Sequence, residues 1–444
     1  MALIPRTPAS TVVVGAGLAG LTAARRLVDA GNEVTVLEAR DRLGGRTHSV
    51  SEGFSDGQHC DLGAELVLRS YHSLISLCAE LGVELSDPVF LERPDTKPDE
   101  TSLEGFLAEG RIIVDGELLT GEAFEEVGAE IRKALRDAPL APHEILDQWT
   151  RRARLSPRAR GALSGMLRMA VQYDPFQTDG HHVAGGQLGT VRRIVGGSGR
   201  LAEALADGID IRLDTPVLAL RQSGGRVTVE TESGATTTAD RVIVAVPPFV
   251  VPTLGFDPPL PGSRVGALTS LQRAAGGKVI AQYAEGDAVR AALTRGVFSN
   301  GPVNTAWVGN PYVTEGPAVV SGFLCGTDRH LFESDDAAVA ALDAVVETAV
   351  GASVTRIAST HKDWTPDRFA LAMGTTHPAT QVSSLVAQFA LPDRRVHFAG
   401  DYTAGPLSGT MEAAVKSGER AAAEVLRRPG RRQLTEIDST LVRG

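Results

Sequence analysis

Cysteine is scarce in this chain of 444 residues, and basic side chains are outnumbered by acidic ones. Its three cysteines, Cys60, Cys78 and Cys325, are an odd number and contain no Cys-x-x-Cys pair. This disfavours a disulfide framework and a zinc site of linked cysteines, so we expect buried, reduced thiols. Lysine and arginine total 44 against 54 acidic residues, which gives a formal net charge of −10. The chain therefore lacks the basic field that a nucleic-acid partner requires.

Long apolar runs are also missing. No stretch reaches the roughly 18 apolar residues that can cross a bilayer, and the first ten residues lack the apolar centre of a signal peptide. We therefore expect a soluble, cytoplasmic protein with no membrane partner. No Gly-x-Ser-x-Gly elbow surrounds Ser408, so the sequence does not indicate a serine hydrolase.

Glycine, in contrast, is plentiful, and the first glycines form a nucleotide-binding pattern. A short β-branched run ends at Gly15, and an amphipathic helix follows to Ala30. Gly15, Gly17 and Gly20 have the spacing that permits a tight turn, close approach of a pyrophosphate and close helix packing. Glu38 ends the next strand, where its carboxylate would accept hydrogen bonds from ribose hydroxyls. This unit predicts a dinucleotide site at the edge of a parallel sheet.

A second glycine pair, just after Glu38, favours FAD over NAD. Gly44 and Gly45 stand among arginines, and Arg40 and Arg46 are the candidates for further contacts with the pyrophosphate. A plain dinucleotide-binding turn does not need this second pair. An NAD-dependent dehydrogenase is therefore disfavoured.

A third motif lies near the C-terminus. A strand over 396–398 is followed by Gly400 and Asp401, and then by a helix from Thr410 to Leu426. Asp401 would orient the ribityl-phosphate end of a flavin. The helix N-terminus at Thr410 and Met411 would stabilise negative charge on a reduced flavin ring.

The rest of the pattern predicts an α/β protein with two domains. Proline pairs at 247–248 and 258–259 mark a crossing between them. We expect helices over 123–136, 142–154, 157–171 and 335–350, strands over 217–220, 227–230, 242–246, 278–283 and 319–324, and an acidic loop over 88–109.

Together these motifs resemble the flavin-containing amine oxidase family, of the monoamine oxidase and polyamine oxidase type. The resemblance extends from about Val12 to Leu426 and includes the segments Asp61-Leu62-Gly63-Ala64, Gly196-Gly197, Pro216-Val217, Ala245-Val246-Pro247-Pro248, Gly277-Lys278-Val279 and Asp363-Trp364. It implies a Rossmann-like FAD-binding domain and an α+β substrate domain. The expected FAD domain comprises 1–85, 190–262 and 390–430, the substrate domain comprises 86–189 and 263–389, and 431–444 form a tail.

The resemblance also implies roles for single residues. The Val217 backbone would hold the adenine, while Ala64 and Trp364 would lie near the flavin. Lys278 would be catalytic and would act through a water at flavin N5. The alternative without a function is a lysine on an edge strand whose ammonium lies in solvent. The implied reaction moves a hydride from the carbon beside an amine nitrogen to FAD, giving an imine, and O2 then regenerates FAD with release of H2O2. The sequence leaves a homodimer open.

Two departures from the family pattern concern the cofactor and the substrate. Met373 stands where mammalian-type members carry a cysteine bonded to the flavin, so we expect noncovalent FAD. The two tyrosines that cage the substrate amine correspond to Gly374 and Thr410, neither of which is aromatic. A flavin desaturase or dehydrogenase, acting on a C–C or C–N bond of a larger substrate, is therefore an alternative. A flavin-binding module without turnover is a third hypothesis.

The remaining candidates for the substrate pocket are individual side chains. Glu65 would bind a cationic amine if it faces the flavin, or it is a structural carboxylate with satisfied hydrogen bonds. Tyr173 and Phe323 are candidate pocket aromatics, together with Met373, Gly374 and Thr410. The adjacent pair at 181–182 is histidine, but two neighbouring loop histidines without further ligands do not predict a metal site.

Overall fold

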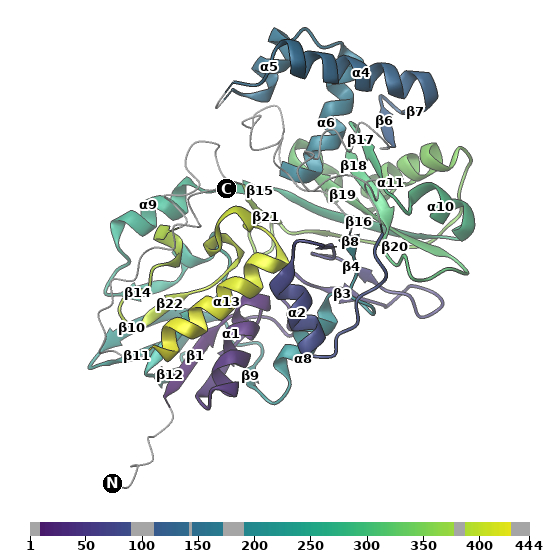
Figure 1. Ribbon diagram of the computed structural model, residues 1–444. Coiled ribbons are helices and arrows are strands. Elements are labelled where there is room, and N and C mark those ends of the chain that lie inside the picture. Colours follow the sequence, from purple (N-terminus) through teal and green to yellow (C-terminus); the bar gives the residue numbers. More distant parts are fainter. Residues whose placement is uncertain (1–8, 90–110, 142–143, 172–190, 377–386, 428–444) are drawn as a thin grey trace.

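A parallel five-stranded sheet carries the first glycine turn. The computed structural model describes residues 9–89, 111–141, 144–171, 191–376 and 387–427 (Figure 1). The strand order is β22-β13-β1-β2-β9, and every neighbouring pair is parallel. These strands are β1 (Ser10–Val14), β2 (Glu33–Leu37), β9 (Asp210–Arg212), β13 (Arg241–Val244) and β22 (Val396–Phe398). The sheet thus combines three distant parts of the chain.

Both faces of this sheet are covered, which explains its β-branched sequence. Val13, Val36 and Ile243 pack on one face against α1, α2, α8 and α13. Val12 and Val14 pack on the other face against a four-stranded sheet and α9. The elements in these two layers are α1 (Leu18–Asp29), α2 (His72–Glu80), α8 (Gly199–Ala206), α13 (Met411–Leu426), β10 (Val217–Ser223), β11 (Arg226–Thr231), β12 (Thr236–Ala239), β14 (Gly255–Asp257) and α9 (Gly262–Ser270).

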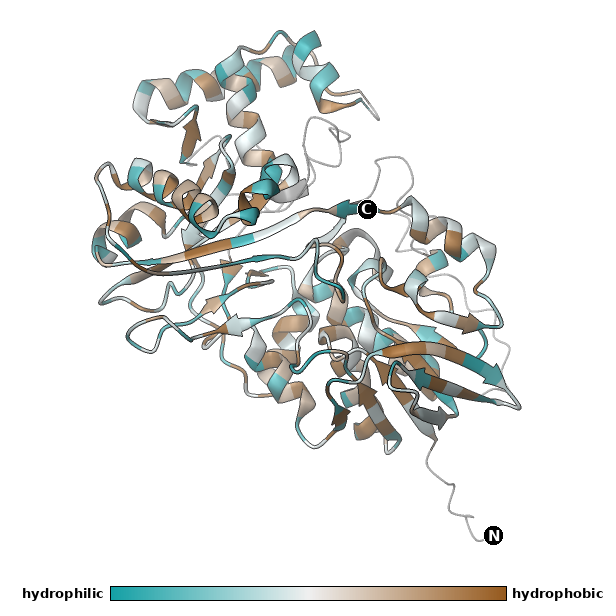
Figure 2. Cartoon of the chain, turned by 180° about the vertical axis from the view of Figure 1, so that it is seen from behind, coloured by the Kyte–Doolittle hydropathy of each residue, from teal (hydrophilic) through white to brown (hydrophobic). Residues whose placement is uncertain are grey.

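A seven-stranded, largely antiparallel sheet forms the upper half of the molecule in Figure 1. Its order is β20-β16-β19-β18-β17-β6-β7. The strands are β6 (Ile112–Val114), β7 (Glu117–Leu119), β16 (Gly276–Tyr283), β17 (Val297–Ser299), β18 (Val303–Val308), β19 (Ala318–Cys325) and β20 (Arg356–Asp363). Its helices are α4 (Gly121–Asp137), α5 (Leu146–Arg152), α6 (Pro157–Val171), α10 (Gly286–Leu293) and α11 (Asp335–Val350). Figure 2 shows apolar residues along the strands that these helices cover.

One face of β16 is covered by helices, and the other face turns toward the N-terminal part of the chain. Val279 and Ala281 pack under α10 and α11. Alternate residues point the other way, and Ile280 joins a small core with Cys60 and Leu62. Lys278 lies on this second face. Three short pairs complete the connections: β3 (Ser49–Val50) with β4 (Cys60–Asp61), β5 (Val67–Leu68) with β8 (Val191–Arg192), and β15 (Gln272–Ala274) with β21 (Gly374–Thr376).

Most predicted elements are present, and the differences have local causes. The predicted helix over 142–154 begins only at Leu146, because Ile145 is extended with ψ 134°. The acidic loop lies mostly outside the described residues. The five-stranded sheet falls within the predicted FAD segments and the seven-stranded sheet within the predicted substrate segments, while the boundaries themselves stay a prediction. Within the described ranges, no helix has the length and apolar content needed to cross a membrane.

Candidate active site

A cavity of about 440 Å³ runs from the carboxyl edge of the parallel sheet to the face of β16. This edge is the usual ligand site of open α/β sheets. Many of the predicted residues line it: Gly15, Gly17, Glu38, Arg40, Gly44, Gly45, Arg46, Ala64, Val217, Lys278, Phe323, Trp364, Met373, Gly400, Asp401, Thr410 and Met411. Residues missed by the sequence analysis line it too, among them Leu18, Thr215, Leu254 and Arg368. The structure therefore brings the three glycine motifs to one wall, while their contacts with a cofactor stay a prediction.

The first glycine turn is shaped by close backbone approach. Gly15 has φ +102°, a conformation that disfavours other residues. A Cβ added to Gly20 would lie 2.0 Å from the Gly15 carbonyl oxygen, so Gly20 acts from behind the wall by packing α1 against the turn. Gly17 caps α1 without a side-chain hydrogen bond. The first N–H groups of α1 therefore remain available to an anion in the cavity.

Glu38 fastens this turn to the end of β2. Its Oε2 accepts a hydrogen bond from the Ala16 N–H at 2.6 Å, and its Oε1 accepts one from the Arg40 N–H at 2.9 Å. Glu38 is 5% exposed and lines the cavity. Each carboxylate oxygen has a further lone pair, so the same group can also accept a ribose hydroxyl.

Positive charge gathers around the Trp364 ring at the cavity wall. The Arg40 and Arg42 guanidinium carbons lie 6.0 Å from the ring centroid, and Lys362 Nζ lies 5.0 Å from it. Burial, followed by repulsion from Arg40, lowers the pKa of Arg42 to about 10. Trp364 Nε1 donates to the Leu62 carbonyl at 3.0 Å. This charge and the open helix N-terminus fit an anionic group such as a pyrophosphate.

Asp367 balances part of this charge. Its carboxylate accepts hydrogen bonds from Arg40 at 2.6 and 3.1 Å and from Lys362 at 2.8 Å. Burial alone would raise the pKa of Asp367, but these hydrogen bonds outweigh burial and lower it to about 2. The Arg40–Asp367 ion pair holds Arg40 against the Phe369 ring, and the guanidinium carbon lies 5.4 Å from the ring centroid.

We expect Asp367→Asn to destabilise the fold at neutral pH but not in strong acid. The folded pKa lies below the ordinary value of 3.8, so the ionised carboxylate stabilises the fold above about pH 4, by about 1–2 kcal/mol. This contribution disappears as the pH falls from about 4 to about 2. Urea unfolding of both proteins across this range measures the difference. A difference that persists unchanged in acid would contradict the assignment.

Arg46 connects three segments of the wall. One terminal nitrogen donates to Asp401 Oδ1 at 2.5 Å and the other to the Met373 carbonyl at 3.2 Å. Asp401, expected to orient a ribityl-phosphate, is thus paired with a cation in the same cavity. Thr410 caps α13, because its Oγ accepts from the Ala413 N–H at 3.1 Å. Thr410 and Met411 line the cavity, so the N-terminus of α13 adds a second partial positive charge to its wall.

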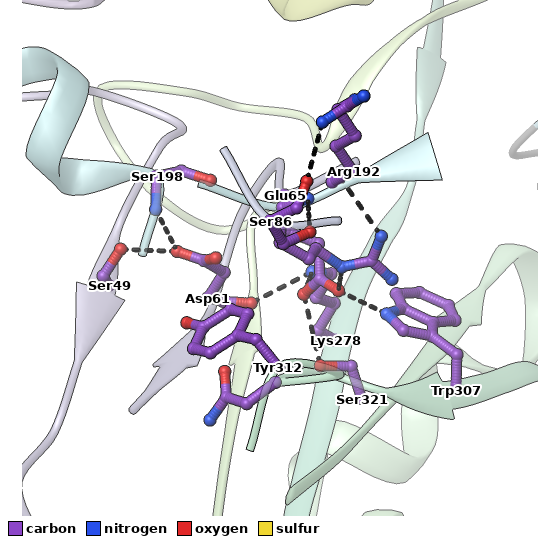
Figure 3. A network of polar contacts seen from close by, with 12 residues as sticks. Ser49, Asp61, Glu65, Ser86, Arg192, Ser198, Lys278, Trp307, Tyr312 and Ser321 are labelled. Atoms are coloured by element: carbon purple, nitrogen blue, oxygen red, sulfur yellow. Dashed lines mark hydrogen bonds and ion pairs between the residues drawn. The ribbon is translucent and has the colours of Figure 1, made fainter. Parts of the chain in front are cut away.

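Lys278 is buried at the far end of the cavity, and only 2% of its surface is exposed. Its Nζ donates to Glu65 Oε2 at 2.6 Å and to the Asp61 carbonyl at 3.0 Å (Figure 3). The ring centroids of Trp307 and Phe323 lie 5.3 and 5.7 Å from Nζ. Because β16 lies between β20 and β19, the alternative of an edge-strand lysine with its head in solvent is wrong.

Of the two interpretations of Glu65, the structure supports the structural carboxylate with satisfied hydrogen bonds and not the group that faces the cavity. It is 3% exposed, and within the described part of the chain it stands outside the cavity lining. Its carboxylate accepts hydrogen bonds from Lys278, Arg193, Trp307 and Ser321. Burial would raise the pKa of Glu65, but Lys278 and Arg193 lower it further than burial raises it.

The other pocket candidates have different positions. Phe323, Met373 and Thr410 line the cavity, whereas Gly374 pairs with Ala274 in the β15–β21 ribbon. Tyr173 and the histidine pair at 181–182 lie outside the described residues. Neither Arg193 nor Ser321 was predicted from the sequence. In the sequence, Ser321 is indicated only by its position two residues before Phe323, on the same face of β19. No sequence pattern indicates Arg193.

Comparison with known proteins finds relatives over nearly the whole chain. The sequence model of a family described as flavin containing amine oxidoreductase matches residues 18–426. Flavin-containing amine oxidase B of Sus scrofa is 29% identical over 466 residues, covering 96% of this chain and 88% of the relative. Wild-type putrescine oxidase bound to putrescine has a TM-score of 0.74 at 22% identity, with 96% and 100% covered. Cyclohexylamine oxidase from Brevibacterium oxydans has a TM-score of 0.76 at 21% identity, with 94% and 99% covered. These two structures share the fold.

Proposed function

Because this chain belongs to the family of flavin-containing amine oxidoreductases, we propose that it is an FAD-dependent oxidase of amines. In this proposal the substrate carbon beside the amine nitrogen loses a hydride to give an iminium ion, which releases a proton to form the imine; the hydride and this proton together supply the two hydrogens of H2O2. FAD, when bound, supplies the chemistry of accepting that hydride and passing two electrons to O2, which yields H2O2. The main support is the continuous cavity that joins the first glycine turn to Lys278.

The residues present fit such a cofactor. The glycine turn and the N-terminus of α1 would hold the pyrophosphate, with Arg40, Gly44 and Gly45 beside it. Glu38 would accept the ribose hydroxyls, and Val217 would hold the adenine at the opposite end from Lys278. The N-terminus of α13 would stabilise negative charge on the ring.

The chain's own side chains then prepare the reacting end of the cavity. Lys278 holds an ammonium at the wall, where it can bind a water or meet the negative charge that develops during reduction of O2. Phe323, Met373 and Leu62 line the same cavity with apolar side chains, which reduce its access to water. No acid or base is needed if the amine binds in its neutral form. The protein therefore acts by orientation and electrostatics.

The substrate is proposed only as a class. The neighbouring structures are named as oxidases of putrescine and cyclohexylamine, which are aliphatic amines. Gly374 and Thr410 supply no pair of aromatic faces to hold a small aryl amine. This departure favours an aliphatic or larger amine, and it also supports the alternative of a desaturase that acts on a larger substrate.

We expect the purified protein to be yellow and to release its flavin on acid precipitation. The reason is that Met373, whose carbonyl accepts from Arg46, offers no thiol for a covalent bond to the ring. The measurement is the visible spectrum of the supernatant and of the pellet. Flavin that stays with the pellet would contradict noncovalent binding, and a colourless protein that cannot be reconstituted with FAD would overturn the proposed function.

Mixing the oxidised protein with a panel of amines in the absence of O2 tests the reaction. Bleaching of the flavin by an aliphatic amine, followed by recovery of colour and formation of H2O2 on admitting air, is the expected result. A flavin that stays oxidised with every amine, but is bleached by a compound whose C–C single bond can be oxidised to a double bond, would establish the desaturase instead.

A further inference from the structure

Glu65 divides its carboxylate between two buried cations. Its Oε2 accepts from Lys278 Nζ at 2.6 Å and from Ser321 Oγ at 3.2 Å. Its Oε1 accepts from Arg193 Nε at 3.1 Å and from Trp307 Nε1. The side chains of Arg193, Glu65 and Lys278 are 6%, 2% and 2% exposed, so solvent does little to screen them. Four donors therefore fix the orientation of this one carboxylate.

These contacts leave Lys278 one unused proton. An ammonium has three N–H donors. In the described residues two of them are used, on Glu65 and on the Asp61 carbonyl. Lys278 also lines the large cavity, so the third N–H is the one available to whatever occupies it.

We infer that Glu65 is a positioning residue that fixes Lys278 as an ammonium at the cavity wall, with its third N–H directed to the occupant. This inference rests on the proposed function, because it assigns the ammonium to the reacting end of an FAD site. Glu65 acts only through Lys278. Without Glu65, the ammonium would lie near Arg193 with no counter-ion between them, which would favour loss of its proton.

Other charged groups around Lys278 do not replace Glu65. Asp61 offers Lys278 only its carbonyl, because its carboxylate accepts from Ser49 Oγ and the Ser198 N–H. Burial and the charge of Glu65 raise the pKa of Asp61, which favours its neutral form. The titratable or charged groups that face this site from the neighbouring elements are His59, Cys60, Asp61, Glu65, Arg193, Tyr312 and Lys362, the last paired with Asp367.

The test is the pH dependence of sulfite binding to the FAD-loaded protein, since sulfite adds to an oxidised flavin as an anion and needs no substrate. In the parent protein Glu65 holds the Lys278 ammonium in place. We therefore expect the affinity for sulfite to stay nearly constant from neutral pH to about pH 9. In Glu65→Gln, binding weakens about tenfold relative to the parent as the pH rises, because Lys278 loses its proton. Lys278→Met binds weakly throughout, and adding Glu65→Gln to it introduces no further pH dependence.

A second readout needs no cofactor. In Glu65→Gln the buried Lys278 ammonium no longer has a carboxylate beside it, so the free energy of unfolding should rise with pH through the alkaline range, where the ammonium can lose its proton. The slope should vanish in the Glu65→Gln/Lys278→Met double variant. Asp343→Asn is the matched control, since Asp343, in α11, accepts from Tyr283 Oη at 2.8 Å at the end of β16 and pairs with Arg356 at the start of β20. It should change stability without a Lys278-dependent slope.

The two readouts separate the inference from the proposed function. A Lys278-dependent titration in Glu65→Gln supports the inference, even if no amine is ever oxidised. Identical pH profiles for the parent and Glu65→Gln overturn it, even in an active amine oxidase. If Glu65→Gln does not fold, Glu65→Asp replaces it. The shorter carboxylate should retain the charge and restore the parent's pH profile. A Lys278-dependent titration in Glu65→Asp would overturn the inference.

Discussion

Gly20→Ala is expected to weaken FAD binding by about 10- to 100-fold, the effect of about 1–3 kcal/mol of overpacking on the turn. The new methyl group would lie 2.0 Å from the Gly15 carbonyl oxygen and 3.2 Å from Ala245 Cβ. Gly15 and Ala245 line the cavity, so relief of this contact must move the wall on which the pyrophosphate would rest. The dissociation constant of FAD, titrated into cofactor-free protein, measures the loss.

A second glycine provides the control for this prediction. Gly266 lies within α9, and a Cβ added there would meet nothing within 4 Å. Gly266→Ala should bind FAD as the parent does and should be slightly more stable, because alanine favours a helix. Equal FAD affinity in the Gly20 and Gly266 variants would contradict the role given to the first turn.

Lys278→Met is expected to reduce turnover by about 10²-fold or more while FAD stays bound, the scale of losing one charged group that stabilises a transition state. The reoxidation of reduced flavin by O2 should slow more than its reduction by amine, because negative charge develops on oxygen near the lost ammonium. Rapid mixing separates these two half-reactions. Normal rates for both would remove Lys278 from the reaction.

Lys362→Met is the comparison for this variant. Lys362 pairs with Lys278 across neighbouring strands, but it bonds Asp367 and is 30% exposed. Loss of its ammonium should lower stability and have a much smaller effect on the reoxidation rate. A similar loss in both variants would point to general electrostatics of the sheet instead of a local role for Lys278.

Elements that depend on local sequence could be predicted closely. The helix Asp335–Val350 has the predicted bounds because Ser334 Oγ caps its N-terminus and Gly351, with φ +79°, ends it. The first glycine unit is equally local, since its strand, turn and helix are consecutive. The bounds of α5 were less accurate because nothing in its sequence announces that Ile145 is extended.

The network at Lys278 could not be predicted in the same way. Glu65 lies 213 residues before Lys278 and 128 before Arg193 in the sequence, so the three side chains come from separate parts of the chain. No spacing along the chain encodes such contacts, because they depend on how the sheets pack. From the sequence alone, Glu65 and Lys278 were therefore separate candidates, two interpretations of Glu65 stayed open, and nothing indicated that Arg193 joins them.

The position of β1 has a consequence for biosynthesis. β1 begins at Ser10 and pairs with β13, which in turn pairs with β22, whose last residue is Phe398. A ribosome must therefore synthesise the chain as far as β22 before the sheet beneath the first glycine turn is complete, although domains often fold as they emerge. The Arg46–Asp401 pair joins residues 355 positions apart and adds to the same delay. If the first glycine turn binds flavin as proposed, a nascent chain stalled before β22 should not retain it.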